Sequence, residues 1–354
     1  MNTEQLSFFN TINSQLDPTA AFEALADSMP PESIAVLEHY GFLAVEGPDT
    51  GKFLQGQTTC DLDKVSDTQA QLGAFCTVKG RTLSSFLIAS DQQHHLLRMR
   101  RDLVATTAKA IAKYIVFSKA THTDASEDFT AIGLSGATAG SIIARVFGAL
   151  PGGQYQSVSR DGAVVVQLDE GAMLFECWLP SDQLALLWPQ LNSGQALLSA
   201  QHWQLLVIRQ GCGEVSAATS ELFIPQMLNY HLTGAISFTK GCYTGQEVIA
   251  RMHYKGKLKR QLYRIALETK SIEPGDDLYG PNSEQSIGKI VNCIAVGAHR
   301  SEALAVITRA NVDADNVLFR PQQAAVVGAS NADEISQNIA VTILSLPYTL
   351  NEQT

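Results

Sequence analysis

The chain has 354 residues, of which 45% are hydrophobic and 17% are charged, and its net charge at pH 7 is −10. This length predicts two or three packed units, and the composition excludes general disorder. The acidic balance argues against a general DNA or RNA binder, because positive charge is what holds a phosphate backbone. The chain starts without a secretory signal pattern, and no run reaches the roughly 18 apolar residues of a membrane-spanning helix. We therefore expect a cytoplasmic protein with no membrane segment.

The first part of the chain predicts a strand, a hairpin and a helix. Residues 41–47 are typical of a short strand. Residues 84–91 and 94–100 predict the two strands of a hairpin around the polar pair at 92–93. An apolar stripe follows at helical spacing, formed by Val104, Ala108, Ile111 and Ile115. This part of the chain is therefore expected to form a strand–strand–helix unit.

The later part predicts a second hairpin, a helix and a β unit. Residues 162–168 and 172–179 predict a hairpin, and residues 197–209 predict a helix that ends at Gly211. After about residue 258 short apolar strands alternate with Pro–Gly and Gly–Pro pairs. A separate C-terminal β unit is expected there.

The six cysteines are scattered, each at least 16 positions from the next, and no CxxC pair occurs. This pattern favours reduced thiols over a disulfide framework. The histidines share no metal-ligand spacing with the cysteines, so we predict no metal site.

The densest motif is KGCYTGQEVIAR, at positions 240–251. Its two glycines permit a tight backbone path that presents polar side chains. Lys240, or a helix N-terminus beginning near Gln246, would favour the thiolate of Cys242. From the residues alone the loop is either a structural glycine turn or a site with a reactive thiol. The candidate functional residues are Cys242, Lys240, Tyr243, Gln246, Glu247 and Arg251.

This motif, together with FIPQMLNYHLTGAISF at 223–238, resembles the signature of the YgfZ family. That family comprises folate-binding, iron–sulfur-linked proteins related to the glycine cleavage T-protein, an aminomethyltransferase. Weaker similarity covers nearly the whole chain in order, in FLQGQTTCDL (53–62), VKGR (78–81), YIVFSKAT (114–121) and LPYTL (346–350).

The resemblance implies an α+β, three-domain fold like that of the T-protein. Residues 1–50 and 125–255 would form a split first domain that carries the motif. Residues 51–124 would form an inserted ferredoxin-like α+β domain, and residues 256–354 a C-terminal β-barrel. The three domains would surround a central cavity.

The resemblance also implies folate, in the form of tetrahydrofolate, as the cofactor. Folate has a flat pterin, a benzoyl ring and an anionic tail, so its site needs an aromatic wall, a polar group that binds the pterin edge and some positive charge. Trp203 matches a family tryptophan at the folate cavity, and Tyr40 stands where the family can carry another. Without the family, Trp203 on a helix beside Leu206 and Val207 is better explained as a core residue.

Two segments depart from the T-protein pattern. T-proteins bind the pterin edge with a glutamate, and this chain has Arg209 at the corresponding position. A guanidinium only donates hydrogen bonds, whereas the amino group and ring N–H of a pterin need an acceptor. Gln210 or Glu214 could substitute as the acceptor. The region that matches the T-protein's catalytic aspartate contains Asp102, flanked by arginines, which is typical of a salt-bridged or solvated helix start.

The leading hypothesis is a folate-binding accessory protein that supports assembly or repair of iron–sulfur enzymes and thereby tRNA modification. Cys242 would be its functional thiol, with transient iron–sulfur involvement. Its partners would be folate and iron–sulfur client enzymes, including those that thiolate tRNA. Strong direct tRNA binding is not expected, because the acidic charge favours an indirect effect.

Two alternatives stay open. One is a folate-dependent aminomethyl or methyl transferase of the T-protein type, which needs a general base in the cavity, with Asp102 as the candidate. The other is a scaffold that has lost its ligand. The basic run from Arg251 to Arg264 fits a polyglutamate tail, an acidic partner, RNA phosphate or simply a solvated strand face.

Overall fold

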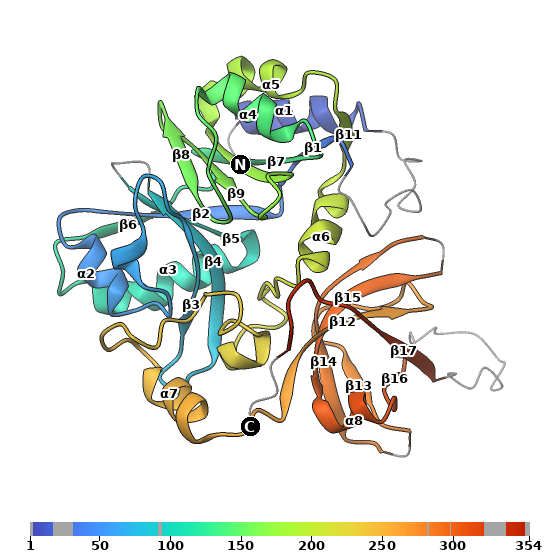
Figure 1. The fold of residues 1–354 in the computed structure, drawn as a ribbon. Coiled ribbons are helices and arrows are strands. Elements are labelled where there is room, and N and C mark those ends of the chain that lie inside the picture. The colour runs from blue at the N-terminus through green and yellow to red at the C-terminus, as the bar shows by residue number, and fades with distance from the viewer. Residues whose placement is uncertain are drawn as a thin grey trace.

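The computed structural model describes residues 3–16, 31–90, 94–281, 283–297, 299–321 and 338–350. Within these residues the chain forms two sheets and a closed β-barrel (Figure 1). Buried residues from both sheets form one cluster, so the two sheets pack against each other and helices cover their outer faces. This architecture confirms the predicted α+β fold with a C-terminal barrel.

The first sheet has six strands in the order β11-β1-β7-β10-β9-β8. Their bounds are Ala196–Leu198, Ser33–Val36, Phe129–Ser135, Leu174–Pro180, Ala163–Gln167 and Ser157–Arg160. Helices α1 (Thr3–Asn13), α4 (Ala139–Phe147) and α5 (Leu184–Leu191) lie together above this sheet in Figure 1. The hairpin predicted at 162–179 is β9 and β10, which pair antiparallel.

The second sheet has five strands in the order β3-β4-β5-β2-β6. Their bounds are Gln71–Cys76, Thr82–Ser90, His95–Arg100, Tyr40–Glu46 and Thr121–Asp124. Helices α2 (Thr50–Gln55) and α3 (Arg101–Ile115) cover its outer face. The predicted hairpin is β4 and β5, and the predicted apolar stripe lies on α3; the turn at 92–93 lies outside the described residues. Strand β2, within the 1–50 part of the expected first domain, pairs with β5 and β6 of this sheet.

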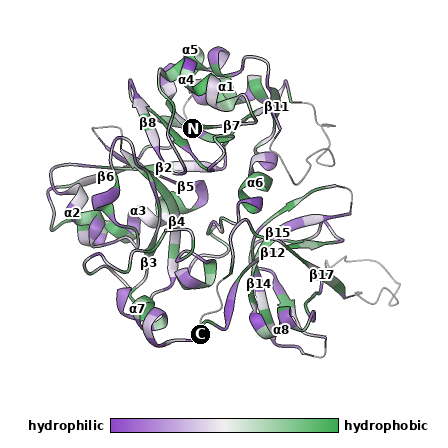
Figure 2. Ribbon diagram, in the orientation of Figure 1, coloured by the Kyte–Doolittle hydropathy of each residue, from purple (hydrophilic) through white to green (hydrophobic). Residues whose placement is uncertain are grey.

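The barrel closes in the order β12-β15-β14-β13-β16-β17. Its strands are Arg260–Leu267, Ser301–Thr308, Ser286–Ala295, Asp277–Tyr279, Leu318–Phe319 and Ile339–Leu344, and α8 (Arg309–Asp313) follows β15. Its interior is filled by alternate apolar side chains, among them Ile265, Ala305 and Ile307. Figure 2 shows hydrophobic residues along these strands, whereas α7 (Gln246–Lys255) carries both hydrophilic and hydrophobic residues.

Helix α6 (Ala200–Arg209) runs between the six-stranded sheet and the barrel (Figure 1). Short 3-10 turns lie at Leu62–Lys64, Ser181–Gln183 and Pro225–Leu228. The chain then passes along the five-stranded sheet to α7 before it enters the barrel. This path brings α6, the sheets and the barrel together at the centre of the molecule.

Candidate functional site

A central cavity lies where the two sheets meet α6. It draws side chains from both sheets and from the segment after α6, namely Leu72, Arg98, Tyr155, Leu168, Leu174, Trp203, Leu206, Val207, Gln210, Cys212 and Glu214. The side chains leave about 30 Å³ between them, the share of roughly one water molecule. A neighbouring space shares Arg98 and Glu214 and reaches Tyr230 and Ala235, in the segment that leads to the motif.

One wall of the cavity is a buried network of charges centred on Arg98 of β5. Its guanidinium donates to both carboxylate oxygens of Glu176 at 2.9 and 3.0 Å, and to Glu214 at 2.6 Å. Glu176 also accepts from the indole of Trp178 at 3.0 Å, and Glu214 accepts from the hydroxyl of Tyr40 at 2.8 Å. Two strands of different sheets and the segment after α6 are therefore joined through one guanidinium.

Burial and neighbouring charges set the ionisation of this network. Burial raises the pKa of Glu176 although Arg98 opposes that shift. Burial works against the charge of Arg98, but Glu176, Tyr40 and Glu214 together hold its pKa well above the usual value. With both carboxylates ionised the network has one negative charge in excess. A carboxylate offers about four lone-pair positions, so Glu214 retains capacity to accept from a ligand.

Trp203, which the sequence predicts as a folate contact, is one of the aromatic residues that line the cavity. Its side chain is 2% exposed, and its benzo edge lies over Gly133 of β7, where an added Cβ would collide with the ring. Its indole Nε1 is buried and donates to no acceptor among the described residues. Buried donors in folded proteins are nearly always satisfied. A polar ligand atom in the cavity would supply the missing acceptor.

Tyr155 is a second aromatic residue of the cavity. It precedes β8 with a φ of 58°, a conformation that bulky residues rarely adopt. Its carbonyl accepts from the backbone of Ala70 at 2.8 Å, and its N–H donates to Gln167 at 2.7 Å. These two bonds hold the strained residue between the sheets, and strain of this kind clusters at functional sites.

The structure places Tyr40 and Arg209 outside the lining of the cavity. Tyr40 is buried beneath Arg98, whose guanidinium lies 3.9 Å from the centre of its ring, and it supports Glu214. Arg209 donates to Glu302 of the barrel at 2.9 Å, and Arg264 donates to the same carboxylate at 2.6 Å. Arg209 therefore ties α6 to the barrel, and Gln210 and Glu214 are the polar residues of this segment that line the cavity.

The motif forms a loop that rests on the segment after α2. The ammonium of Lys240 donates to the carbonyls of Thr58 and Cys60 at 2.8 and 2.6 Å, and it lies 5.1 Å from the ring centre of Tyr243. Burial lowers the pKa of Lys240 to about 8. The N–H of Thr244 donates to the carbonyl of Gly56 at 3.1 Å. The loop is thus fixed to the segment that follows α2 by backbone and ammonium hydrogen bonds.

Helix α7 begins at Gln246, as predicted, directly after Gly245. Gly245 has a φ of +84°, and an added Cβ would lie 2.5 Å from the carbonyl oxygen of Thr77. The side-chain amide of Gln246 donates from Nε2 to the carbonyl of Gly241 at 3.4 Å, whereas Glu247 and Arg251 are exposed on the helix. Tyr243 is buried, and its burial raises the pKa of its hydroxyl.

The thiol of Cys242 is exposed at the tip of this loop. The other five cysteines are buried or half-buried, and burial raises the pKa of Cys60 to about 11 and of Cys212 and Cys293 to about 12. A thiol reacts as the thiolate, so these groups are poor nucleophiles at neutral pH. Cys242 is therefore the cysteine that a partner can reach.

Asp102, the candidate general base, does not line the cavity. Asp102 is exposed at the start of α3 and accepts from the N–H of Ala217 at 3.1 Å.

Among the described residues no group of three His, Cys, Asp or Glu side chains is placed to hold a metal ion. Within the same residues, no helix combines the length and the apolar character that crossing a membrane requires.

Sequence reasoning did not find Arg98, Glu176 or Tyr155. Glu176 is the one charged residue of β10, and Arg98 lies between Leu97 and Met99 in β5; such buried charges are themselves a signal, because a buried charge needs a partner. Tyr155 follows two glycines in a turn, and nothing in that pattern indicates a ligand.

Comparison with known proteins finds relatives in sequence and, separately, a solved structure with a similar fold. The chain is 33% identical over 262 residues to the tRNA-modifying protein YgfZ of Pectobacterium carotovorum. The aligned region covers 74% of this chain and 78% of that protein. It is 30% identical to the YgfZ of Colwellia psychrerythraea over 91% of this chain and 95% of the relative. No family model matches the chain.

Among solved structures, the aminomethyltransferase T of the glycine cleavage system from Bartonella henselae matches with a TM-score of 0.62 and 15% identity. The match covers 91% of this chain and 87% of that protein. At this identity the likeness shows the fold alone, which is that of the T-protein. The sequence identity to the curated relatives, over most of their length, shows that the chain belongs to the YgfZ family.

Proposed function

We propose that this chain is a folate-binding accessory protein that supports iron–sulfur enzymes, including those that thiolate tRNA, and thereby tRNA modification. The observation that carries the folate part is the buried, unpartnered indole N–H of Trp203 in a cavity that Glu214 also lines. The name of the curated relatives, tRNA-modifying protein, supports the tRNA part.

The cavity residues fit the chemistry of a pterin. A pterin presents an amino group and a ring N–H together with acceptor atoms, so it needs both an acceptor and a donor in its site. Glu214 can accept and the indole of Trp203 can donate, while Tyr155 and Trp203 offer aromatic surface. Because the present space holds about one water, binding must move side chains apart. We expect Leu72, Tyr155 and Leu168 to move, because these lining side chains are only partly buried.

Cys242 supports the iron–sulfur part of the proposal. Clusters of four irons are held by four cysteine thiolates, whereas this chain exposes one thiol. We therefore assign Cys242 a transient contact with a client protein that keeps the cluster. Aminomethyl transfer has less support as a function, because Asp102, its candidate general base, is not among the residues that line the cavity.

The folate site is tested by calorimetric titration of tetrahydrofolate into the wild type and three variants. We expect saturable binding by the wild type, a roughly tenfold loss in Trp203→Phe, which keeps a ring but removes the N–H, and a larger loss in Trp203→Ala. Trp188→Phe is the matched control, because Trp188 packs against Phe8 on the outer face of the six-stranded sheet, away from the cavity. It should bind as the wild type does. No saturable binding by the folded wild type would reject the folate site.

A further inference from the structure

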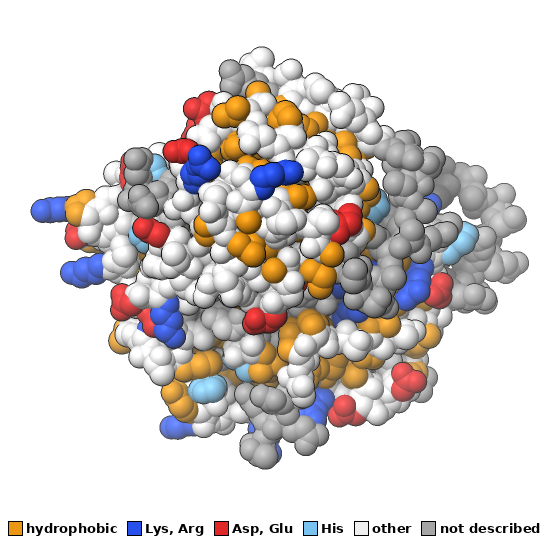
Figure 3. All heavy atoms as spheres, turned by 45° about the horizontal axis from the view of Figure 1, so that its top comes forward, with side chains coloured by type: hydrophobic (Ala, Val, Ile, Leu, Met, Phe, Trp, Pro, Cys, Tyr) orange, Lys and Arg blue, Asp and Glu red, His pale blue; other side chains and the backbone are white. Residues whose placement is uncertain are grey.

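A strip of positive charge crosses the surface between α7 and the barrel. Between Lys240 and Arg264 the sequence has seven basic residues and one acidic residue. Five of the basic residues form what we call the basic strip, and all five are exposed: Arg251, Lys255, Lys257, Lys259 and Arg260. By contrast, acidic and basic side chains are interspersed over the face shown in Figure 3.

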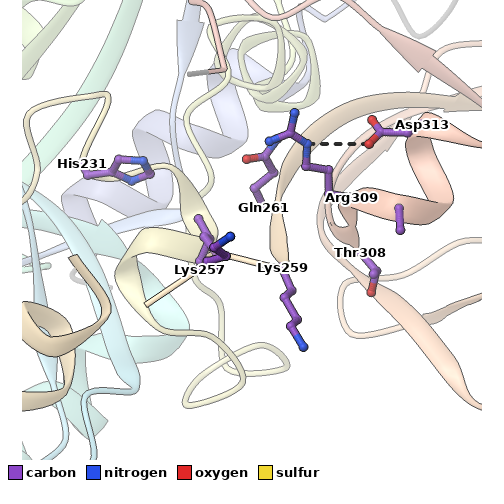
Figure 4. A pocket seen from close by; sticks show the side chains of 9 residues that line it. His231, Lys257, Lys259, Gln261, Thr308, Arg309 and Asp313 are labelled. Carbon is purple, nitrogen blue, oxygen red and sulfur yellow. Dashed lines mark ion pairs between the residues drawn. The ribbon is translucent and has the colours of Figure 1, made fainter. Parts of the chain in front are cut away.

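Two hollows flank the middle of the basic strip, each of about 410 Å³. Lys257 and Lys259 border both of them. The first hollow is closed on its far side by α8, where Arg309 pairs with Asp313 at 3.6 Å (Figure 4). The second hollow is bordered by Arg81 of the hairpin β3–β4. Within the described part of the chain, Lys257 and Lys259 have no acidic partner, so their charge is available to a ligand.

Tyr254 is exposed next to Lys255 of the basic strip in the sequence, and it lines neither of the two hollows. It is 69% exposed in the last turn of α7, between Arg251 and Lys255. Its ring meets His253 edge-on with the centroids 4.8 Å apart, and His253 stacks on Phe238 at 3.7 Å. The ring of Tyr254 therefore packs against His253 and is otherwise largely open to solvent. Exposed aromatic rings beside basic grooves are how proteins hold single-stranded nucleic acids, by stacking and by phosphate contacts.

We propose that the basic strip binds single-stranded RNA, with Lys257 and Lys259 at the phosphates and Tyr254 stacked on a base. The net charge of −10 does not prevent this, because salt screens charges beyond about 8 to 10 Å and a bound strand senses the local field. The proposal rests on the proposed function only for the choice of RNA as ligand. No residue of the strip lines the central cavity, so folate binding and RNA binding can fail separately.

The test is fluorescence anisotropy of a labelled single-stranded RNA 12-mer with the full chain, at salt concentrations from 50 to 200 mM. Each phosphate contact to a single strand adds about 0.7 to the slope of log affinity against log salt. We expect Lys257→Ala/Lys259→Ala to weaken binding and to reduce that slope by about 1.4. Tyr254→Ala should weaken binding roughly tenfold and leave the slope unchanged.

The control is a matched set on α3, where Lys109, Lys113 and Tyr114 are exposed. Lys109→Ala/Lys113→Ala and Tyr114→Ala should bind RNA within about twofold of the wild type. Equal losses in both sets would overturn the proposal, as would absence of salt-dependent binding by the wild type. Displacement of the RNA by polyglutamate of equal charge, with no effect of Tyr254→Ala, would also overturn it and indicate a site for a polyanionic tail. Tetrahydrofolate titration of the same variants reports on the cavity independently.

Discussion

Cys242 differs from every other cysteine of the chain in its access to solvent. Cys242→Ala should abolish complementation of iron–sulfur enzyme activity in cells that lack this protein. It should change the free energy of unfolding by no more than about 0.5 kcal/mol, because an exposed side chain makes few contacts. The measurements are client activity in the complemented cells and urea unfolding of the purified variant.

Cys293→Ala is the matched control, because that thiol is half-buried in the barrel and its pKa is raised to about 12. It should complement fully. Full complementation by Cys242→Ala would remove this thiol from the mechanism.

Single residues show what the sequence could and could not predict about the site. Cys242 stands in the motif that carries the family signature, and Trp203 matches a family tryptophan, so both could be named from the sequence; Trp203 lines the cavity. The role of Arg98 was not predictable, because it depends on Glu176 and Glu214, which lie 78 and 116 positions away. Likewise, Arg209 aligned with a pterin-reading position, yet the helical path of α6 turns its side chain to Glu302.

The sequence predicts those secondary-structure elements that depend on the pattern of consecutive residues. It does not predict which strands pair when the partners are far apart in the chain. The two hairpins and α3 follow from alternation and helical spacing in a few consecutive residues. The place of β2 in the five-stranded sheet does not follow in this way, because the residues that it pairs with in β5 are 50 to 60 positions away. The strand pattern of 41–47 is the same whichever sheet it joins, so only tertiary structure assigns it.

The start of α7 depends on one of the two motif glycines. Gly245→Ala should destabilise the protein by about 2 kcal/mol, because a positive φ and a Cβ close to the carbonyl of Thr77 both oppose a side chain. Gly241→Ala meets no atom within 4 Å and has no positive φ, so it should lie within about 0.5 kcal/mol of the wild type. Urea unfolding of both variants measures the difference. Equal stabilities would show that the loop can shift without cost.

At the scale of the whole molecule, the cavity depends on how α6 is held against the barrel. Glu302 of β15 joins Arg209 of α6 to Arg264 of β12, and all three are largely buried. Trp203 lies on the same helix as Arg209, so this ion triad fixes the cavity wall relative to the barrel. The sequence predicted a barrel and a helix but not the ion triad between them, because Arg209, Arg264 and Glu302 are far apart in the chain.

Glu302→Gln should lower the free energy of unfolding at pH 7 by about 3 kcal/mol, since it leaves two buried guanidiniums without their carboxylate. Burial raises the pKa of Glu302, but Arg209 and Arg264 bring it below the usual 4.5. The ionised carboxylate therefore stabilises the fold above about pH 4.5, and this contribution is lost as the pH falls through the lower pKa of the folded chain. The difference between wild type and variant should shrink over that range, as measured by urea unfolding at successive pH values. Asp313→Asn, which breaks the exposed pair with Arg309, should cost no more than about 0.5 kcal/mol. A deficit in Glu302→Gln that did not change with pH would place the loss in packing rather than in the ion triad.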